Sequence, residues 1–456
     1  MENITAEKLT TPELEELLRE RKLHEARERM SEMMEADLAE LLSELDEEHL
    51  SIAFRILPKE LAADAFSYLE SETQQTLIKA LSDKELNFLI ENLFLDDTVD
   101  MIEEMPANVV KRILSNTDPV TRREINELLK YPEDSAGSIM TTEYVRLQEG
   151  MTVQQAFDRI RKVGVDKETI YTCYVTNAKR ELLGVVTIKD LLLAEYETEI
   201  RDIMETNVIY VNTMEDQEKV AHSFDRYDFL SIPVVDKEHR LVGIITFDDV
   251  IDVLQEENTE DIERMAAIIP TDKPYIKTSA FETFKKRIPW LLLLMISATF
   301  TGGIIAHYEK ALGAYVVLTA YIPMLMDTGG NAGSQASVSV IRGISLEEIE
   351  FKDIFRIQGK EFFVSLLCGV TLAIANFLKL IFIDQVSVTI SLVVCLTLVC
   401  TVIVAKFVGC SLPILAKKVG FDPAVMASPF ITTIVDALSL LIYFQFASHI
   451  LGIRPQ

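Results

Sequence analysis

Apolar residues follow three different spacings along this chain, and each spacing predicts a different kind of structure. Up to about residue 130, leucines recur at i, i+3 and i+4, as in Leu14, Leu17 and Leu18, which is the spacing of an amphipathic helix. From about residue 136, short apolar runs bounded by turns alternate with helical stretches. Beyond residue 287 the apolar runs reach the length of a bilayer. The sequence therefore predicts a multidomain protein with an all-α part, an α+β part and a helical membrane part.

Residues 1–132 are predicted to form a stack of short helices. Thr11-Pro12 and Ser82-Asp83 have the residue types of helix starts, and prolines punctuate the series at Pro58, Pro106 and Pro119. Acidic residues recur between the leucines, including Asp96, Asp97 and Asp100. Without other information, such residues are expected on the solvated faces of the helices.

An internal repeat follows, predicted as two units over residues 133–197 and 198–256. Ser138-Ile-Met-Thr-Thr-Glu-Tyr-Val-Arg-Leu147 is echoed by Asp202-Ile-Met-Glu-Thr-Asn-Val-Ile-Tyr-Val211. Leu183-Gly-Val-Val-Thr-Ile-Lys-Asp-Leu191 is echoed by Val242-Gly-Ile-Ile-Thr-Phe-Asp-Asp-Val250. The two offsets, 64 and 59 residues, place a small insertion near residues 164–168 of the first copy. Each copy predicts strand, helix, strand, strand, helix.

This repeat resembles the paired CBS module. In CBS modules the Thr and Asp of the Gly-x-x-Thr-x-x-Asp ending often hold the ribose and phosphate of an adenosine nucleotide. The matching residues are Thr187 with Asp190 and Thr246 with Asp249, so ATP is a candidate ligand. The alternative is that each Thr caps the following helix and each Asp adds charge to its first turn.

Five apolar spans are predicted within residues 277–456. They cover about residues 288–306, 312–341, 362–383, 386–415 and 425–451, and only the second is interrupted by polar residues. Lys and Arg gather on one side of these spans, whereas the other side has only Lys310, Lys379 and Arg454. By the positive-inside rule the N-terminal parts are expected in the cytoplasm and the C-terminus outside an inner, or plasma, membrane.

The polar interruption runs from Pro323 to Ser337 and contains Gly, Asn, Ser, Thr and Gln. Lipid offers no hydrogen bonds, so these residues must face other helices or a water-filled path. Asp327 lies in this stretch and Asp436 lies in the last span. A carboxylate at mid-bilayer costs at least ~2.5 kcal/mol, so such residues are usually kept for a pathway or a buried partner.

Charge is divided unevenly between the two halves. Residues 1–270 hold 60 Asp and Glu against 29 Lys and Arg, whereas residues 271–456 hold 12 against 15. The net charge of −28 is therefore carried by the first half, which argues against a nucleic-acid partner and favours cations. The first residues lack the basic and apolar segments of a signal peptide. The five Cys have no paired spacing and indicate a reducing compartment.

The most acidic segment, Asp248 to Glu263, continues the last helix of the second copy and leads into a connecting helix predicted over residues 251–276. It carries eight carboxylates, several of them three or four residues apart, where like charges destabilise a helix by a few tenths of a kcal/mol per pair. A bound divalent cation would remove that repulsion. A solubilising linker is the alternative.

The order of these parts resembles the MgtE family of magnesium channel-transporters over nearly the whole chain. The resemblance rests on Tyr131-Pro-Glu-Asp-Ser-Ala-Gly137, on Thr328-Gly-Gly-Asn-Ala-Gly-Ser-Gln335, and on Asp422-Pro-Ala-Val-Met-Ala-Ser-Pro-Phe-Ile-Thr-Thr-Ile-Val-Asp436. It implies a homodimer in which each chain has a helical N domain, a CBS pair, a connecting "plug" helix and a five-helix pore domain. It also implies Mg2+ import that stops when cytosolic Mg2+ binds acids of the N domain, CBS pair and plug helix.

The resemblance assigns roles to individual residues. Pore residues for Mg2+ are Asp436, Asn331, Gly329 and Gly330; the alternative for the glycines is close helix packing. Residues of the Mg2+ sensor are Asp64, Asp96, Asp100, Asp216, Glu218, Asp228, Asp249, Asp252, Glu257, Glu260 and Asp261. Asp327 departs from the family pattern, and either adds a carboxylate to the pore or pairs with Lys406.

Two other readings stay open. The chain is alternatively a CBS-regulated carrier of Co2+, Mn2+, Ni2+ or an unrelated substrate, or a membrane-anchored nucleotide sensor without transport. An enzyme is not expected, because the six His are scattered and the sequence has neither a Ser or Cys nucleophile motif nor a phosphate loop.

Overall fold

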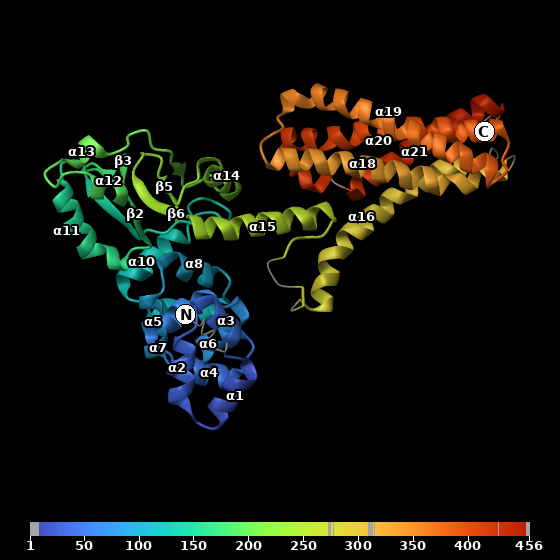
Figure 1. Ribbon diagram of the computed structural model, residues 1–456. Helices are drawn as coiled ribbons and strands as arrows, with labels where there is room; N and C mark the ends of the chain where they lie inside the picture. The colour runs from blue at the N-terminus through green and yellow to red at the C-terminus, as the bar shows by residue number, and fades with distance from the viewer. Residues whose placement is uncertain are drawn as a thin grey trace, which may run out of the picture. The chain divides into compact units, whose positions relative to one another are not determined.

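The computed structural model describes residues 9–271, 275–276, 278–308, 313, 315–426 and 428–452. Within these ranges the chain forms two compact units, up to Val253 and from Leu254 onward. Figure 1 shows the N-terminal helices in blue, the mixed α and β part in green and the long C-terminal helices in yellow to red. The residues expected to mark the outer side, Lys310 and Arg454, lie outside the described ranges.

Residues 9–130 form ten short helices, as the leucine spacing predicts. Ser82 and Asp118 accept hydrogen bonds from the first turns of α7 and α10, and Pro119 stands at the first position of α10. Many leucines of these helices are buried, and Leu14, Leu38, Leu42, Leu77 and Leu86 are completely so. The helices are α1 (Thr11–Arg19), α2 (Leu23–Ser31), α3 (Glu35–Ser43), α4 (Glu47–Ile56), α5 (Lys59–Ser67), α6 (Ser71–Ala80), α7 (Asp83–Asn92), α8 (Leu95–Glu103), α9 (Ala107–Asn116) and α10 (Pro119–Leu128).

The repeat forms two small sheets of the predicted element order. The first has β1 (Tyr144–Gln148), α11 (Val153–Val163), β2 (Thr169–Thr176), β3 (Leu182–Thr187) and α12 (Ile188–Leu193); the second, after α13 (Ile200–Ile203), has β4 (Val211–Asn212), α14 (Gln217–Tyr227), β5 (Ser231–Val235), β6 (Leu241–Thr246) and α15 (Phe247–Met265). In each sheet the first strand is parallel and the third antiparallel to the middle strand. The prediction for this part is confirmed.

The two copies interlock through the residues that define the repeat. A Cβ on Gly184 would lie 2.8 Å from the Glu205 carbonyl oxygen, and one on Gly243 would lie 2.8 Å from the Thr141 carbonyl oxygen. Thr141 pairs with Ile244 and Glu205 pairs with Val185. The start of each copy therefore crosses onto the third strand of the other, where only glycine leaves room.

α15 ends at Met265, so the expectation of a connecting helix to residue 276 is wrong at its C-terminal end. Ala267 adopts the left-handed conformation, with φ 55°. Ile268 N–H then donates to the Glu263 carbonyl at 2.9 Å, which closes the helix as a left-handed C-terminal cap does. The boundary between the two units falls inside α15.

The second unit is a bundle of long helices. They are α16 (Ala280–His307), α18 (Ile322–Ser345), α19 (Ile354–Phe382), α20 (Val388–Val419) and α21 (Ser428–Leu451), with short 3-10 turns η2 (Val316–Tyr321), η3 (Phe351–Asp353) and η4 (Pro423–Met426). The segments of α16, α19, α20 and α21 are long and apolar enough to cross a membrane, whereas α18 carries the polar stretch. α20 packs against α18, α19 and α21, and Figure 1 shows these helices side by side.

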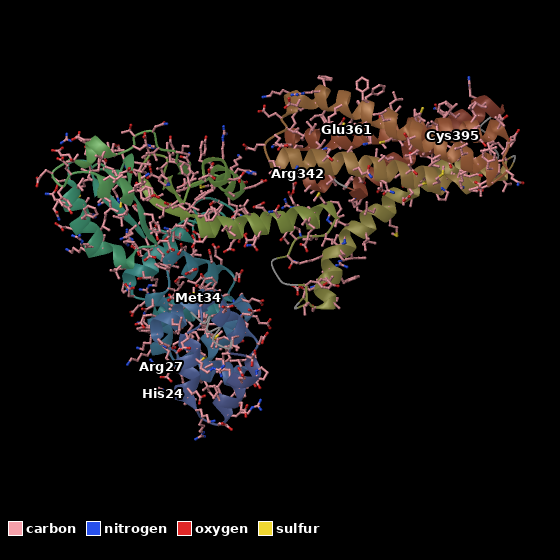
Figure 2. All side chains as sticks on the ribbon, in the orientation of Figure 1. His24, Arg27, Met34, Arg342, Glu361 and Cys395 are labelled. Carbon is pink, nitrogen blue, oxygen red and sulfur yellow. The ribbon has the colours of Figure 1, made fainter. Side chains whose placement is uncertain are left out.

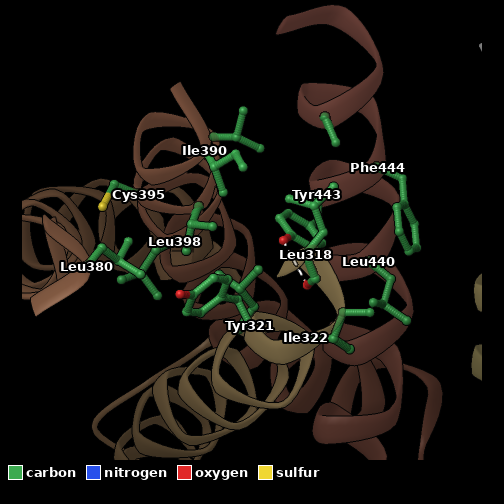
Figure 3. Close-up of a cluster of buried hydrophobic side chains, with 14 residues drawn as sticks. Leu318, Tyr321, Ile322, Leu380, Ile390, Cys395, Leu398, Leu440, Tyr443 and Phe444 are labelled. Carbon is green, nitrogen blue, oxygen red and sulfur yellow. Dashed lines mark hydrogen bonds between the residues drawn. The ribbon is translucent and has the colours of Figure 1, made fainter. Parts of the chain in front are cut away.

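One end of the bundle is held by an apolar cluster drawn in Figure 3. Leu318, Ile322, Leu398 and Tyr443 are almost completely buried there. The Tyr443 hydroxyl donates to the Leu318 carbonyl at 3.0 Å. The cluster therefore fixes the start of α18, which carries the polar stretch, against α20 and α21.

Candidate cation sites in the two units

Three carboxylates of the first unit meet where the N domain contacts the CBS pair. Asp96 stands in the first turn of α8, Glu143 precedes β1 and Glu168 precedes β2. One oxygen of each lies within 4.8 Å of the others. The Leu95 N–H donates to Glu143 Oε2 at 3.1 Å, and the Glu168 N–H donates to the Glu143 carbonyl at 3.0 Å. We call Asp96, Glu143 and Glu168 the acidic site.

The acidic site is built for positive charge. Asp96 is 6% exposed, and burial together with the charge of Asp97 raises its pKa. Burial and neighbouring carboxylates raise the pKa of Asp97 to about 7 and that of Glu168 to about 9. Glu168 Oε2 is buried and has no hydrogen-bond partner among the described residues. A divalent cation that prefers oxygen ligands, such as Mg2+, fits this donor set.

Some of the predicted sensor residues come together around this site. Asp249, at the start of α15, is close enough for the charge of Asp96 to raise its pKa, after burial as the main cause. The charges of Asp96 and Asp249 also act on Asp100, and the charge of Asp64 acts on Asp97. Asp252 lies one turn beyond Asp249 and is exposed. The five predicted sensor residues Asp64, Asp96, Asp100, Asp249 and Asp252 therefore lie, with Asp97, around one region of the first unit.

The remaining sensor residues lie elsewhere. Asp216 and Glu218 begin α14, where Asp216 accepts the Glu218 N–H at 3.1 Å. Asp228 caps the other end of α14, about 18 Å along the helix. Glu257, Glu260 and Asp261 belong to the part of α15 in the second unit. The predicted sensor residues are therefore distributed over several places.

Glu143 and Glu168 are functional candidates that the sequence analysis missed. A signal for Glu168 was present, because it ends the insertion that distinguishes the first copy of the repeat from the second. Glu143 stands within the repeated stretch ahead of β1. The spacing of apolar residues along the chain does not predict that either glutamate lies close to α8.

The candidate nucleotide residues form helix caps. Thr187 Oγ1 donates to Asp190 Oδ2 at 2.5 Å and accepts the Asp190 N–H at 3.2 Å. Thr246 Oγ1 donates to Asp249 Oδ2 at 2.5 Å. The capping role is therefore present in the structure, and nucleotide binding stays a prediction.

The end of α15 is tied to the membrane helices within the second unit. Arg264 forms ion pairs with Glu260 on its own helix and with Asp422, which precedes η4 and α21. Ser345, at the end of α18, donates to Asp261 Oδ2 at 3.3 Å. Met265 packs against Ile341 and Ala424.

The glycines of α18 lie in tight helix contacts. A Cβ on Gly329 would lie 2.6 Å from Thr401 Cγ2 of α20 and 2.9 Å from Val435 Cγ1 of α21, and one on Gly330 would lie 2.9 Å from Thr432 Cγ2. Because α18 is a continuous helix, the carbonyls of these glycines belong to its hydrogen-bond ladder. The packing alternative is what the structure contains, and their role as ligands stays a prediction.

Polar side chains of α18 occupy a different face. Asp327, Asn331 and Gln335 are each exposed on the surface of the single chain, and their spacing of four residues places them in one stripe along the helix. Asp436 is half-buried on α21, close enough to Asp327 for the two charges to interact. Asp436, Asp327 and Asn331 therefore belong to one region of the bundle.

Lys406 resolves one of the alternatives left open by the sequence. Its Nζ lies 3.2 Å from Glu361 Oε2 of α19, and Figure 2 labels Glu361 on that helix. Asp327 makes no ion pair with the residues that the structure describes. Lys406 is thus the partner of Glu361 and not of Asp327.

Comparison with known proteins agrees with this arrangement. Family models match for a divalent cation transporter, MgtE, at residues 322–446, for the MgtE intracellular N domain at 33–134 and for CBS domains at 136–197 and 200–256. The magnesium transporter MgtE of Thermus thermophilus is 38% identical over 442 residues, covering 96% of this chain and 98% of that protein. The chain belongs to the MgtE family.

Two further MgtE relatives cover the chain to different extents. The magnesium transporter MgtE of Bacillus subtilis is 34% identical, covering 95% of each chain. The crystal structure of the cytosolic domain of the Mg2+ channel MgtE in complex with ATP is 41% identical, with a TM-score of 0.51, and covers 53% of this chain and 99% of that one. The helical N domain, the CBS pair and the helical membrane part are thus those of an MgtE protein.

Proposed function

We propose that this chain carries Mg2+ into the cell through a pore in the inner, or plasma, membrane. The observation that carries the proposal is the placement of Asp436 beside the polar stripe of Asp327 and Asn331, within a bundle of membrane-length helices. Full-length relatives named magnesium transporters support Mg2+ as the ion. Intramembrane carboxylates of this kind usually mark an ion pathway.

The pore is proposed to recognise Mg2+ with its water shell. Mg2+ loses water reluctantly and keeps octahedral geometry at about 2.0–2.1 Å. Carboxylate and amide oxygens of Asp436 and Asn331 are suited to accept hydrogen bonds from that water shell. In a homodimer, Asp436 of each chain contributes one negative charge to a shared axis.

Asp327 is proposed as a second pore carboxylate. Since Lys406 is held by Glu361, the charge of Asp327 is left to act on Asp436 and on a passing cation. Its place on the stripe with Asn331 gives it access to the same path. This extends the pore site by one acid per chain beyond what the family resemblance supplies.

Closure is proposed to follow from the acids of the first unit. Without Mg2+, the carboxylates around the acidic site and along α15 repel one another and favour an open arrangement of the cytosolic domains. Bound Mg2+ removes that repulsion and favours a closed one, so uptake is limited by the Mg2+ already inside. The cytosolic placement of the N-terminal domains and the outward C-terminus are part of this proposal.

ATP binding is proposed for the CBS pair, with Thr187 and Asp190 or Thr246 and Asp249 as the contacting residues. The solved relative in complex with ATP supports it. Asp249 would then serve both ATP and the cation sensor. Nucleotide and Mg2+ binding are therefore expected to influence one another.

The pore is tested by Mg2+ flux in liposomes that contain the full-length protein. Asp436→Asn is expected to lower flux by roughly tenfold or more, because the main charge opposite the ion is removed. Dimer assembly should be unchanged by size-exclusion chromatography. Wild-type flux in this variant would refute the pore, and equal transport of Co2+, Mn2+ or Ni2+ would favour the broader divalent carrier.

The sensor is tested by patch recordings at varied internal Mg2+. The triple variant Asp249→Ala, Glu257→Ala, Asp261→Ala is expected to conduct at millimolar internal Mg2+, which closes the wild type. Unchanged inhibition would show that these acids do not sense the ion.

A further inference from the structure

A buried ion pair joins two membrane helices of the bundle. Lys406 of α20 is 6% exposed, and its Nζ lies 3.2 Å from Glu361 Oε2 of α19. Lys406 stands about three helical turns before Lys417, well inside the apolar length of α20. Charges in such a place are costly unless they are paired.

The pair belongs to a fixed antiparallel register between α19 and α20. Toward one end, Gln358 Nε2 donates to Ser411 Oγ at 3.0 Å. Toward the other end, a Cβ on Gly369 would lie 3.3 Å from the Val399 Cα, and Cys395 Sγ donates to the Ala373 carbonyl at 3.4 Å. The two charges are thus matched in height along the helices.

The same segment of α20 forms the wall behind the polar helix. A Cβ on Gly409 would overlap the Gly333 carbonyl oxygen of α18, and one on Gly333 would lie 3.1 Å from the Ala405 carbonyl oxygen. Gly333 also lies against Ile431 and Val435 of α21. Since Ala405 precedes Lys406 and Val435 precedes Asp436, the ion pair and the proposed pore carboxylate stand at the same level of the bundle.

We propose that the Glu361–Lys406 pair positions the pore wall. Apolar contacts between two membrane helices tolerate sliding, because one leucine or valine replaces another at little cost. A slip by one turn, about 5.4 Å, would leave both charges unpaired in an apolar environment. The pair therefore fixes the height of α20, and through Gly409 and Gly333 it fixes α18 and the neighbourhood of Asp436.

This inference rests on the proposed function, since it assumes that α18 and α21 line the path of Mg2+. Glu361 and Lys406 are positioning residues and do not contact the ion. A positioning role predicts a change in the apparent KM for Mg2+, because binding oxygens must be held to within about 0.5 Å of their productive places. A role in folding alone would reduce the amount of dimer and leave KM unchanged.

The experiment measures maximal Mg2+ flux and KM in liposomes for full-length Glu361→Gln, Lys406→Met and the swapped pair Glu361→Lys with Lys406→Glu. Each single variant leaves one buried partner alone and is expected to lower the ratio of flux to KM by roughly tenfold or more. The swapped pair is expected to return this ratio to within about threefold of the wild type. Folded single variants with wild-type KM, or a swap no better than the singles, would overturn the proposal.

Two further variants separate a positioning role of the ion pair from a failure to fold and from a general effect of removing a charge. If the singles do not assemble, the double variant Glu361→Leu, Lys406→Met has no unpaired charge and is expected to fold with a raised KM; a wild-type KM there would also overturn the proposal. Lys379→Met is the matched control, because Lys379 pairs with Asp384 at 2.8 Å on the exposed end of α19. Wild-type flux in Asp436→Asn would instead refute the proposed pore. That outcome does not depend on how the single variants of Glu361 and Lys406 compare with the swapped pair.

Discussion

Carboxylates of the acidic site illustrate how single residues are tuned by their neighbours. Asp96 and Asp97 are adjacent on α8, and the charge of each reaches Glu168 across the contact with the CBS pair. Burial removes water from these groups, and like charges add to the cost of ionisation. The site consequently binds protons when no metal is present, and a metal would displace them.

The pH dependence of stability follows from this tuning. An unfolded glutamate has a pKa of about 4.3, whereas the pKa of folded Glu168 is raised to about 9 and that of Asp97 to about 7. At pH values between the unfolded and the folded pKa of each carboxyl, the folded chain holds a proton that the unfolded chain releases. The free energy of unfolding therefore falls as pH rises from about 5 to 9. Without Mg2+, the melting temperature of the cytosolic part should fall by several degrees over this range.

The measurement is thermal unfolding of the full-length protein in detergent with a chelator, from pH 5 to pH 9. Glu168→Gln should flatten the decline, since the amide does not ionise. Added Mg2+ should restore the melting temperature at high pH, where the carboxylates are free of protons. A wild-type melting temperature that stays constant without Mg2+ would contradict the prediction.

Asp327 gives a second prediction at the residue scale. Asp327→Asn removes one charge per chain that acts on Asp436, and the lost attraction of roughly 1 kcal/mol corresponds to about a fivefold rise in the KM for Mg2+. Flux measured against Mg2+ concentration checks it. Asp384→Asn is the control, because Asp384 is already paired with Lys379, and a KM equal in both variants would place Asp327 outside the path.

At the scale of elements, α18 shows what the sequence could and could not predict. Its polar stripe, its glycines and its depth in the membrane part all follow from the order of residues between Pro323 and Ser337. Its contacts with Gly409 and Thr401 of α20 could not be predicted. The spacing of apolar residues describes a single helix and does not say which distant helix packs against it. For the same reason, the contact of Glu143 with α8 and the ion pair of Glu361 with Lys406 could not be predicted from the sequence.

The end of α15 was missed for a local reason. Ala267 takes a left-handed conformation that alanine seldom adopts, and no glycine marks the place. The repeat, by contrast, was predicted correctly because two copies of one pattern confirm each other. The segment ahead of the first strand of each copy also crosses to the other copy, at Thr141 and Glu205, which explains why Gly184 and Gly243 stand at equivalent positions.

The close contact between α18 and α20 predicts that Gly409 cannot be replaced by a larger residue without loss. Gly409→Ala puts a methyl group into the Gly333 carbonyl, so the helices must separate, at a cost of about 1–3 kcal/mol for overpacking. Mg2+ flux and the melting temperature should both fall. Gly359→Ala on α19 is the matched control, because a Cβ there meets nothing within 4 Å, and equal flux in the two variants would argue against a tight wall behind α18.

On the scale of the whole chain, the two units differ in charge and are connected by one helix. The first 270 residues carry the excess of acids and the rest is nearly neutral. α15 is the element that belongs to both units, with Asp249 near its start and Arg264 near its end. A change sensed by the acids of the first unit therefore has a continuous helix through which to reach the second.

Arg264 is the residue through which that change would reach the pore. It pairs with Asp422 just ahead of α21, the helix that carries Asp436. Arg264→Gln should loosen this link, and the internal Mg2+ concentration for half inhibition should rise by roughly threefold to tenfold, as expected for a coupling of about 1 kcal/mol. Patch recordings at varied internal Mg2+ measure it, and conduction at low internal Mg2+ should stay within about twofold of the wild type.

The control for charge is Lys352→Gln, which removes the same charge from an exposed pair with Glu350 and is expected to leave inhibition unchanged because exposed pairs contribute little. Arg264→Asp combined with Asp422→Arg should recover part of the lost inhibition, since the link is re-formed with its charges exchanged. If Arg264→Gln inhibits like the wild type, α15 does not act on α21 through this pair. The signal would then have to reach the pore through the Ser345 contact of Asp261 or the packing of Met265, and variants at those positions would show the shift instead.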